Sequence, residues 1–149
     1  MPRIREAKIK IESVIENIDN AGLPDGESER NVIDVSGFIH YTDKGILLTY
    51  SEENEGATVY SDISYSDGEV WVKRHGALNS NLFFKEGAEH SSVYEVSPYK
   101  FDATVKTRRI RANFTDVGGE LSLYYNMKIG GAEKNARMKI WISTVSEQN

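Results

Sequence analysis

Cysteine is absent from this chain of 149 residues, proline occurs only three times, and hydrophobic runs are short. Without cysteine the chain can form no disulfide scaffold, zinc knuckle or cysteine-ligated iron–sulfur cluster. The longest apolar stretches, such as Ile46–Leu48 and Val70–Val72, have three residues, whereas a membrane-spanning helix needs about 20. Met1–Lys10 alternates basic and apolar residues and lacks the apolar run of a secretory signal. We therefore expect a cytoplasmic protein that makes no contact with a membrane.

The charge balance is mildly acidic, because 18 Lys and Arg residues oppose 23 Asp and Glu residues and leave a net charge of −5. That balance argues against broad, charge-driven binding to nucleic acid. A chain of this length suits one domain, which buries roughly 70% of the surface that it exposes when unfolded. We expect a single domain over residues 1–149. Its oligomeric state cannot be read from the sequence.

Apolar residues recur at every second position through most of the chain, which is the period of β-strands. Leu121, Leu123 and Tyr125 share one face, and polar residues occupy the positions between them. Asp67-Gly68 and Gly130-Gly131 supply the positive φ that two-residue hairpins need. No window shows a helical period. The pattern predicts about ten strands, at residues 4–18, 30–42, 46–51, 57–65, 69–75, 81–86, 89–96, 100–115, 120–129 and 133–145.

Residues 19–29 form the one segment without a strand pattern. The stretch from Glu16 to Glu29 holds five acidic residues, no basic residue, two glycines and Pro24. Acidic segments of this kind are commonly solvated. We expect a mobile acidic loop at 19–29 that joins the first two strands, and a lid over a cavity is the alternative.

Strands joined by short hairpins must protect the edges of their sheet, and a closed meander does so by pairing every strand. The pattern therefore predicts an all-β fold, an antiparallel up-and-down barrel of eight to ten strands. Eight strands leave an interior that side chains just fill, whereas more strands leave room for a small molecule. The strand count thus permits an interior cavity without requiring one.

Short motifs follow one another in order along nearly the whole chain. They are Val14-Ile15-Glu16-Asn17, Gly45–Ser51 with Glu52-Glu53, Lys73-Arg74-His75-Gly76-Ala77, Phe84 with Gly87, Tyr94–Tyr99, Val105-Lys106-Thr107 with Ile110, and Tyr125-Asn126-Met127. In this order the motifs resemble the YwiB-like family of small, uncharacterised bacterial proteins. The resemblance implies a calycin-like β-barrel, related in architecture to lipocalins and fatty-acid-binding proteins, with no established biochemical activity.

The strand around residues 103–114 changes the parity of its apolar residues. Val105 lies on the odd-numbered face, whereas Ile110 and Phe114 lie on the even-numbered one. A strand with one buried face must keep its parity, so we favour a β-bulge near Thr107–Arg109. The alternative is that Arg108 or Arg109 points into the barrel, where a guanidinium would recognise a carboxylate or phosphate of a ligand.

Four further residues are candidates for contact with a ligand. Arg74 and Asn79 lie where a strand leaves into a polar loop, and they can line the mouth of the barrel. There, Arg74 can instead cover apolar surface with its methylene groups. Tyr94 and Tyr125 each offer a ring and a hydroxyl group to a ligand, although a buried Tyr is more often a core residue with a satisfied hydroxyl.

The segment 100–111 carries five basic residues and one acidic residue, interleaved with aromatic residues. Single-stranded nucleic-acid grooves combine basic tracks with stacking aromatics in this way. Residues of one strand divide between two faces, however, and no RNP or OB-type signature is present. We therefore expect a solvated outer face and no nucleic-acid partner, with an RNA- or protein-binding module as the alternative.

Signatures of metal sites and enzymes are missing. His40, His75 and His90 lie on three separate predicted strands without metal-ligand spacing. The motifs G-x-S-x-G, G-x-x-x-x-G-K-[ST] and G-x-G-x-x-G do not occur. We expect no catalytic residues, no metal ion and no cofactor, and keep an enzyme with its active site in the barrel mouth as an alternative.

The leading hypothesis for function is the binding of a small anionic or amphipathic molecule inside the barrel. It rests on analogy of fold together with the placement of arginines. The residues expected to contact the ligand are Arg74, Asn79, Tyr94, Arg108, Arg109 and Tyr125.

Overall fold

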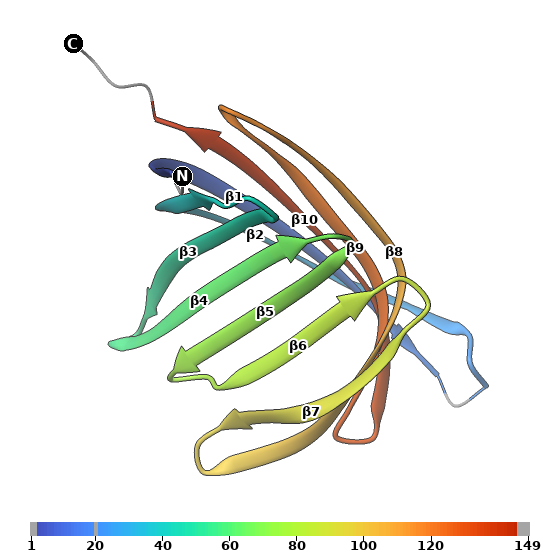
Figure 1. Cartoon of the computed structure of the whole chain (residues 1–149). Helices are drawn as coiled ribbons and strands as arrows, with labels where there is room; N and C mark the ends of the chain where they lie inside the picture. The colour runs from blue at the N-terminus through green and yellow to red at the C-terminus, as the bar shows by residue number, and fades with distance from the viewer. Residues whose placement is uncertain (1–2, 20, 146–149) are drawn as a thin grey trace.

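The computed structural model describes residues 3–19 and 21–145, and the regular elements in these ranges are all β-strands. They are β1 (Arg3–Ile18), β2 (Pro24–Tyr41), β3 (Gly45–Asn54), β4 (Ala57–Ser66), β5 (Glu69–Gly76), β6 (Ser80–Lys85), β7 (Glu89–Val96), β8 (Tyr99–Thr115), β9 (Gly118–Ile129) and β10 (Ala132–Thr144). All ten belong to one antiparallel sheet in the order β6-β5-β4-β3-β2-β1-β10-β9-β8-β7. The first and last strands, β1 and β10, pair in the middle of this order, and the sheet curls so that its edge strands β6 and β7 come together as a barrel (Figure 1). The predicted up-and-down barrel is confirmed.

The barrel is nearly closed, with β6 and β7 at the two ends of the sheet. One bridge joins these two strands, in which the backbone N–H groups of Asn79 and Glu95 each donate to the other residue's carbonyl oxygen at 2.8 Å. At the far end of β6, the Lys85 N–H donates to the Thr107 hydroxyl of β8 at 3.3 Å. Between these two contacts the edges of β6 and β7 face each other, and we call this part of the barrel wall the β6–β7 seam.

An apolar core fills much of the barrel. Alternate residues of the strands point inward, as the period of two requires. Burying one large aliphatic or aromatic side chain stabilises the fold by about 1.5–3 kcal/mol. The largest fully buried side chains include Phe84, Ile9, Ile39, Leu48, Ile63, Leu121, Leu123, Ile140, Val70 and Val72.

Two hairpins have the turn chemistry that their sequences predict. Asp67 and Gly68 have φ values of 54° and 79°, and Gly130 and Gly131 have values of 55° and 84°. Two consecutive residues with positive φ are the requirement of a type I′ turn, whose twist matches that of the strands it joins. Both turns join strands that are neighbours in the sheet, β4 with β5 and β9 with β10.

The predicted loop at 19–29 is shorter than expected, and residues 24–29 belong to β2. The β1–β2 pairing continues outward to Ile18 and Pro24. Here the prediction from acidity and glycine content was wrong, because an exposed two-stranded ribbon is solvated on both faces and accepts acidic residues. The turn itself is held by Asp19, whose carboxylate accepts hydrogen bonds from the N–H groups of Ala21 and Leu23 at 2.9 and 3.0 Å. Residue 20 lies outside the described residues.

Strand β8 contains the expected bulge. Its register with β9 shifts between Thr107, opposite Tyr125, and Arg109, opposite Tyr124. Thr107 is buried before the shift, and Ile110 packs against the core after it. The bulge therefore restores the apolar face of β8 to the interior.

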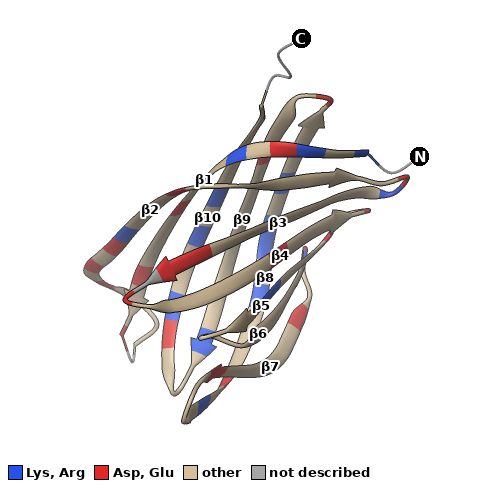
Figure 2. Ribbon diagram, turned by 90° about the vertical axis from the view of Figure 1, so that its left-hand side faces the viewer, with Lys and Arg blue, Asp and Glu red and all other residues tan. Residues whose placement is uncertain are grey.

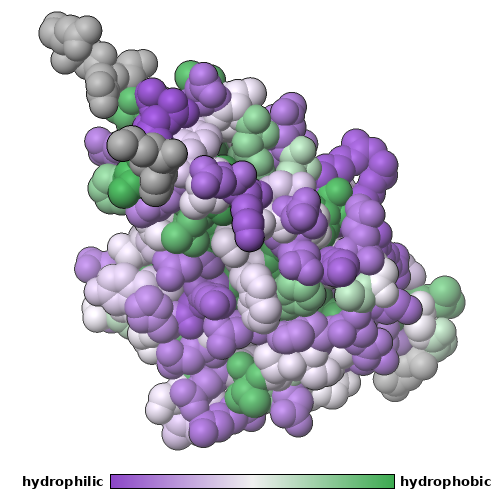
Figure 3. Space-filling view, viewed as in Figure 1, coloured by the Kyte–Doolittle hydropathy of each residue, from purple (hydrophilic) through white to green (hydrophobic). Residues whose placement is uncertain are grey.

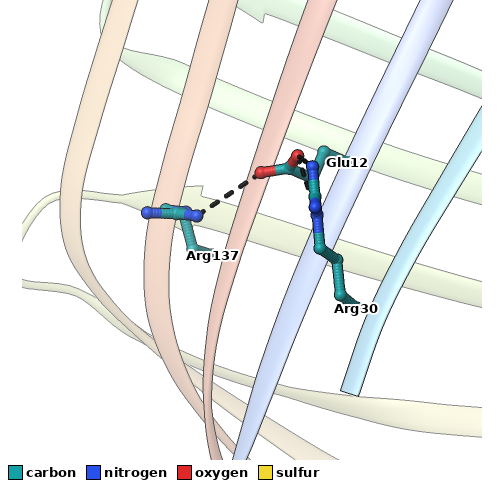
Figure 4. Close-up of polar contacts among 3 residues, drawn as sticks. All are labelled: Glu12, Arg30 and Arg137. Carbon is teal, nitrogen blue, oxygen red and sulfur yellow. Dashed lines mark hydrogen bonds and ion pairs between the residues drawn. The ribbon is translucent and has the colours of Figure 1, made fainter. Parts of the chain in front are cut away.

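A cluster of charges on the outside ties β1 to both of its neighbours. The Glu12 carboxylate accepts hydrogen bonds from Arg30 of β2 at 2.6 Å and from Arg137 of β10 at 3.4 Å (Figure 4). The hydrogen bond from Arg30 is the main cause that lowers the pKa of Glu12. The two contacts join three adjacent strands at the place where the chain's first and last strands meet.

The outer surface is mainly polar. Figure 3 shows one face as mostly hydrophilic, with small and separate apolar areas. Over the described part of the chain we find no helix long and apolar enough to span a membrane.

Candidate functional site

Four polar residues lie side by side on the inner wall of the barrel. Tyr50 of β3 pairs with Ser61 of β4, Ser61 with Arg74 of β5, and Arg74 with Ser80 of β6. Residues that pair directly across antiparallel strands point to the same face. Tyr50, Ser61 and Ser80 are buried, and Arg74 is half-buried. We call Tyr50, Ser61, Arg74 and Ser80 the inner polar row.

Two tyrosines lie near this row. Tyr125 of β9 is buried and packs edge-to-face against Phe84, with 4.8 Å between ring centroids. Arg74 lies close enough to influence the titration of Tyr50 and of Tyr125, and Tyr94 of β7 influences that of Tyr125. The fold thus gathers three of the predicted site residues, Arg74, Tyr94 and Tyr125, from three different strands.

The polar groups of the row lack well-placed partners. The hydroxyl groups of Tyr50, Ser61 and Ser80 are buried, and none has a partner in good hydrogen-bond geometry among the described residues. Ser61 and Arg74 nevertheless face the Tyr50 hydroxyl closely enough that hydrogen bonding opposes the rise in its pKa that burial causes. Within the same ranges Arg74 forms no salt bridge with a carboxylate. Buried polar groups in native proteins are nearly always hydrogen-bonded, and each exception calls for an explanation such as a bound water or ion. Three such groups in one row make it a candidate site for contact with water or with a polar ligand.

Burial keeps Tyr50 and Tyr125 protonated. It raises the pKa of Tyr50 and the pKa of Tyr125, because the phenolate form loses its hydration in the interior. The positive charge of Arg74 opposes both rises. Both side chains therefore carry a hydroxyl hydrogen at neutral pH and can donate it to an acceptor.

A glycine allows the wall next to Tyr50 to form. Gly37 of β2 pairs with Tyr50, and a Cβ atom at this position would collide with the backbone oxygen of Thr49. It would also lie 2.9 Å from the Cβ of Tyr50. The absent side chain thus lets β2 and β3 approach closely where Tyr50 is held.

Asn79 has a structural role that the sequence did not reveal. Its backbone forms the bridge to Glu95, and its side-chain amide donates a hydrogen bond to the carbonyl of Gly76 at 3.3 Å. Its amide therefore holds the β5–β6 turn next to Arg74.

Arg108 and Arg109 do not point inward. Both are exposed, and both lie on the outer wall because the bulge places two successive residues opposite one residue of β9. The alternative in which one of them enters the interior is therefore wrong. As a consequence, neither residue joins Arg74 in the inner site.

The three histidines lie apart, on β2, β5 and β7. His75 stacks on Tyr60 with 5.1 Å between ring centroids, and His90 packs against the rings of Trp71 and Phe83. Among residues 3–19 and 21–145, no three His, Asp or Glu side chains come together as a metal-binding group.

Sequence reasoning missed two members of the inner polar row, namely Tyr50 and Ser61. A signal for both was present, since Tyr50 shares its parity with Leu48, and Ser61 with Ile63. A polar residue in phase with buried apolar ones is a candidate for an inward position. The sequence placed Ser80 in the polar loop after Arg74, whereas the structure makes it the first residue of β6, with its side chain buried.

Comparison with known proteins gives a consistent result. Residues 9–142 match the family described as Domain of unknown function (DUF1934). The uncharacterized beta-barrel protein YwiB of Bacillus subtilis (strain 168) is 28% identical over 127 residues, which cover 85% of this chain and 84% of that protein. The crystal structure of the ywiB protein from Bacillus subtilis superimposes with a TM-score of 0.83 at 26% identity, covering 96% of this chain and 94% of that one. The chain therefore belongs to the DUF1934 family and shares the β-barrel of YwiB.

Proposed function

We propose that this protein binds a small anion, or the anionic head group of an amphipathic molecule, at the inner polar row. The observation that carries the proposal is the convergence of Arg74, which has no carboxylate partner among the described residues, with three buried hydroxyl groups that lack partners in good hydrogen-bond geometry. A buried polar group without a hydrogen bond costs about 1–3 kcal/mol. An anionic ligand would remove that cost for several groups at once.

The chemistry of the row suits an oxyanion. Arg74 offers several N–H donors in a planar fork, a geometry that matches a carboxylate or a phosphate. The hydroxyls of Tyr50 and Ser61 belong to adjacent strands and can each donate one hydrogen bond to the same ligand. Since burial raises the pKa of Tyr50 and that of Tyr125, these residues serve as donors. That supports a binding role for them over the role of a general base.

The apolar core limits the size of the ligand. Phe84 lies against Tyr125, and aliphatic side chains fill the barrel beyond it. We therefore expect a compact anion, or the anionic head group of a larger molecule, at the inner polar row. Such metabolites are abundant in the cytoplasm, where we propose that the protein acts.

Native mass spectrometry of the protein purified from its own host tests the proposal. We compare the wild-type chain with Arg74→Met, which keeps a long flexible side chain but removes the charge. We expect the wild type to carry a noncovalent anionic species that Arg74→Met lacks. The matched control is Arg109→Met, which removes an exposed arginine from the outer wall and is expected to keep the bound species.

Two results would overturn the proposal. One is a wild-type chain that is bare under gentle conditions and gains no thermal stability from added phosphate or carboxylates, because a ligand that binds only the folded state must stabilise it. The other is a bound species that persists in Arg74→Met.

A further inference from the structure

The outer wall formed by β8, β9, β10 and β1 is basic, although the whole protein is acidic. Figure 2 shows blue bands of basic residues along β8 and β10. Alternation and register place ten basic side chains on this wall: Lys8, Lys10, Lys100, Lys106, Arg108, Arg109, Arg111, Lys128, Arg137 and Lys139. They place six acidic ones there: Glu6, Glu12, Glu16, Asp102, Glu120 and Glu133. The wall thus carries a net charge of +4 in a protein whose net charge is −5.

The bulge in β8 brings the positive charges of this strand together on the outer wall. In a regular strand Arg108 and Arg109 would point to opposite faces. Because the register shifts between Thr107 and Arg109, both arginines point outward, and Arg111 follows on the same side. The expectation from the sequence that the bases of this segment divide between two faces was therefore wrong.

Most of these basic groups have no acidic partner. Arg137 pairs with Glu12, and Lys100 pairs with Glu95. The other eight form no salt bridge among the residues that the structure describes. Exposed cations without intramolecular partners are available to a polyanion.

Two aromatic side chains lie among the cations. Tyr124 is half-buried and stands in one cross-strand row between Arg109 and Arg137. Trp141, also half-buried, lies 5.4 Å from the Lys10 ammonium and 5.1 Å from that of Lys139. A flat ring flanked by basic groups is the arrangement on which nucleic-acid bases stack while phosphates meet the cations.

Shallow clefts connect these features. Arg108, Tyr124 and Arg137 line one cleft of about 320 Å³. Arg108 also borders a neighbouring cleft of about 300 Å³, in which it stands with Lys106 and Lys128 beside Glu89 and Glu133, so that three bases face two acids. A third, of about 660 Å³, lies beside Trp141, Lys8 and Lys10. A chain of nucleotides could follow the wall from one cleft to the next.

We propose that the outer wall of β8, β9, β10 and β1 binds single-stranded nucleic acid. The unpaired cations contact phosphates, and Tyr124 and Trp141 stack against bases. A single strand is favoured over a duplex because bases that are already paired and stacked cannot reach a ring held in a cleft. This surface is separate from the inner polar row, so either proposal can fail without the other.

Fluorescence anisotropy with a labelled single-stranded RNA tests the proposal. We use an oligonucleotide of about 16 nucleotides, the upper site size of comparable platforms, beginning at about 50 mM salt because phosphate contacts weaken as salt rises. The wild-type protein is expected to bind, and R109E/R111E to bind at least about tenfold more weakly. The slope of log affinity against log salt should fall by about 1.4 in this variant, since each lost phosphate contact accounts for about 0.7. The control K44E/K73E makes the same change of charge away from the wall and is expected to retain wild-type affinity.

Tyr124→Ala separates base stacking from charge. We expect it to weaken RNA binding by about 5- to 150-fold, the equivalent of about 1–3 kcal/mol for one stacked base. Tyr60→Ala, which removes an exposed tyrosine from β4, is the matched control and should bind as the wild type does. The chain contains two tryptophans, so Trp71→Phe leaves Trp141 as the one fluorophore of this type, and RNA is expected to quench it.

Three outcomes would overturn the proposal. One is the absence of RNA binding by a folded wild-type protein at low salt. Another is equal loss of binding in R109E/R111E and K44E/K73E. The third is that inorganic polyphosphate or duplex RNA binds as tightly as the single strand, while Tyr124→Ala binds RNA as the wild type does. That result would show that the wall recognises negative charge alone and that no base stacks on it.

Discussion

At the scale of single residues, the interior of this barrel departs from the usual rule that buried polar groups find partners. Tyr50, Ser61 and Ser80 leave their hydroxyl groups unpaired around Arg74. A fold that needed only stability would place apolar groups at these positions, since replacing unpaired polar groups by apolar ones is close to neutral or stabilising. Their presence supports the proposal that this row binds a ligand.

The buried tyrosines predict a loss of stability in alkaline solution. Burial raises the pKa of Tyr50 and that of Tyr125 above the unfolded value of about 10. Above pH 10 the unfolded chain therefore loses these protons more readily than the folded protein does. Their contribution to stability is complete below about pH 10 and is lost as the pH rises through the folded pKa. Urea unfolding between about pH 8 and 11 measures this decline.

Tyr50→Phe is the informative variant in that experiment. It removes one ionising group together with one unpaired hydroxyl, so we expect a shallower alkaline decline and no loss of stability at neutral pH. Tyr60→Phe on the exposed surface of β4 is the control. A decline in Tyr50→Phe as steep as that of the wild type would show that Tyr50 does not ionise in the way we describe.

At the scale of elements, the bulge of β8 determines which face each arginine takes. The sequence was sufficient to predict this bulge, because the change of parity between Val105 and Ile110 is local. It was also sufficient for the strand count and for the turns at Asp67-Gly68 and Gly130-Gly131. It was not sufficient for the inner polar row, because the pairing of Tyr50 with Ser61 and of Ser61 with Arg74 depends on the register of three strands. At residues 24–29 the acidic composition wrongly indicated a loop, because hydrogen bonding to β1 makes this segment part of β2.

From the charge cluster of Glu12, Arg30 and Arg137 we expect the stability of the fold to fall in acid. Hydrogen bonding to Arg30 lowers the pKa of Glu12 below its usual value of 4.5. A lowered pKa contributes stability that is present above the unfolded pKa and is lost as the pH falls through the folded one. We expect Glu12→Gln to have a lower Tm at pH 7 and a flatter decline of Tm below about pH 4.5. If the wild type and Glu12→Gln had the same Tm at every pH, this cluster would not stabilise the fold.

At the scale of the whole molecule, the barrel closes between β6 and β7, where few hydrogen bonds join the two edge strands. Between the Asn79–Glu95 bridge and the contact of Lys85 with Thr107, β6 and β7 share no ladder of backbone hydrogen bonds. Arg74 belongs to β5, the neighbour of β6. The β6–β7 seam therefore lies one strand from the proposed anion site.

Hydrogen exchange should report this seam. Backbone amides of β6 and β7 that face the seam are expected to exchange faster than those of β9, which is paired on both sides. Amide exchange followed by NMR makes the comparison residue by residue. Protection along β6 and β7 that equals that of β9 would mean that the barrel is fully closed in solution.

The central claim is that an anion occupies the space beside Arg74, and a high-resolution crystal structure of protein purified from its host tests it most directly. We expect density from a group other than water within hydrogen-bonding distance of the Arg74 guanidinium and of the hydroxyls of Tyr50 and Ser61. A tightly packed interior around these hydroxyls, with the Arg74 side chain turned out into solvent, would contradict the account.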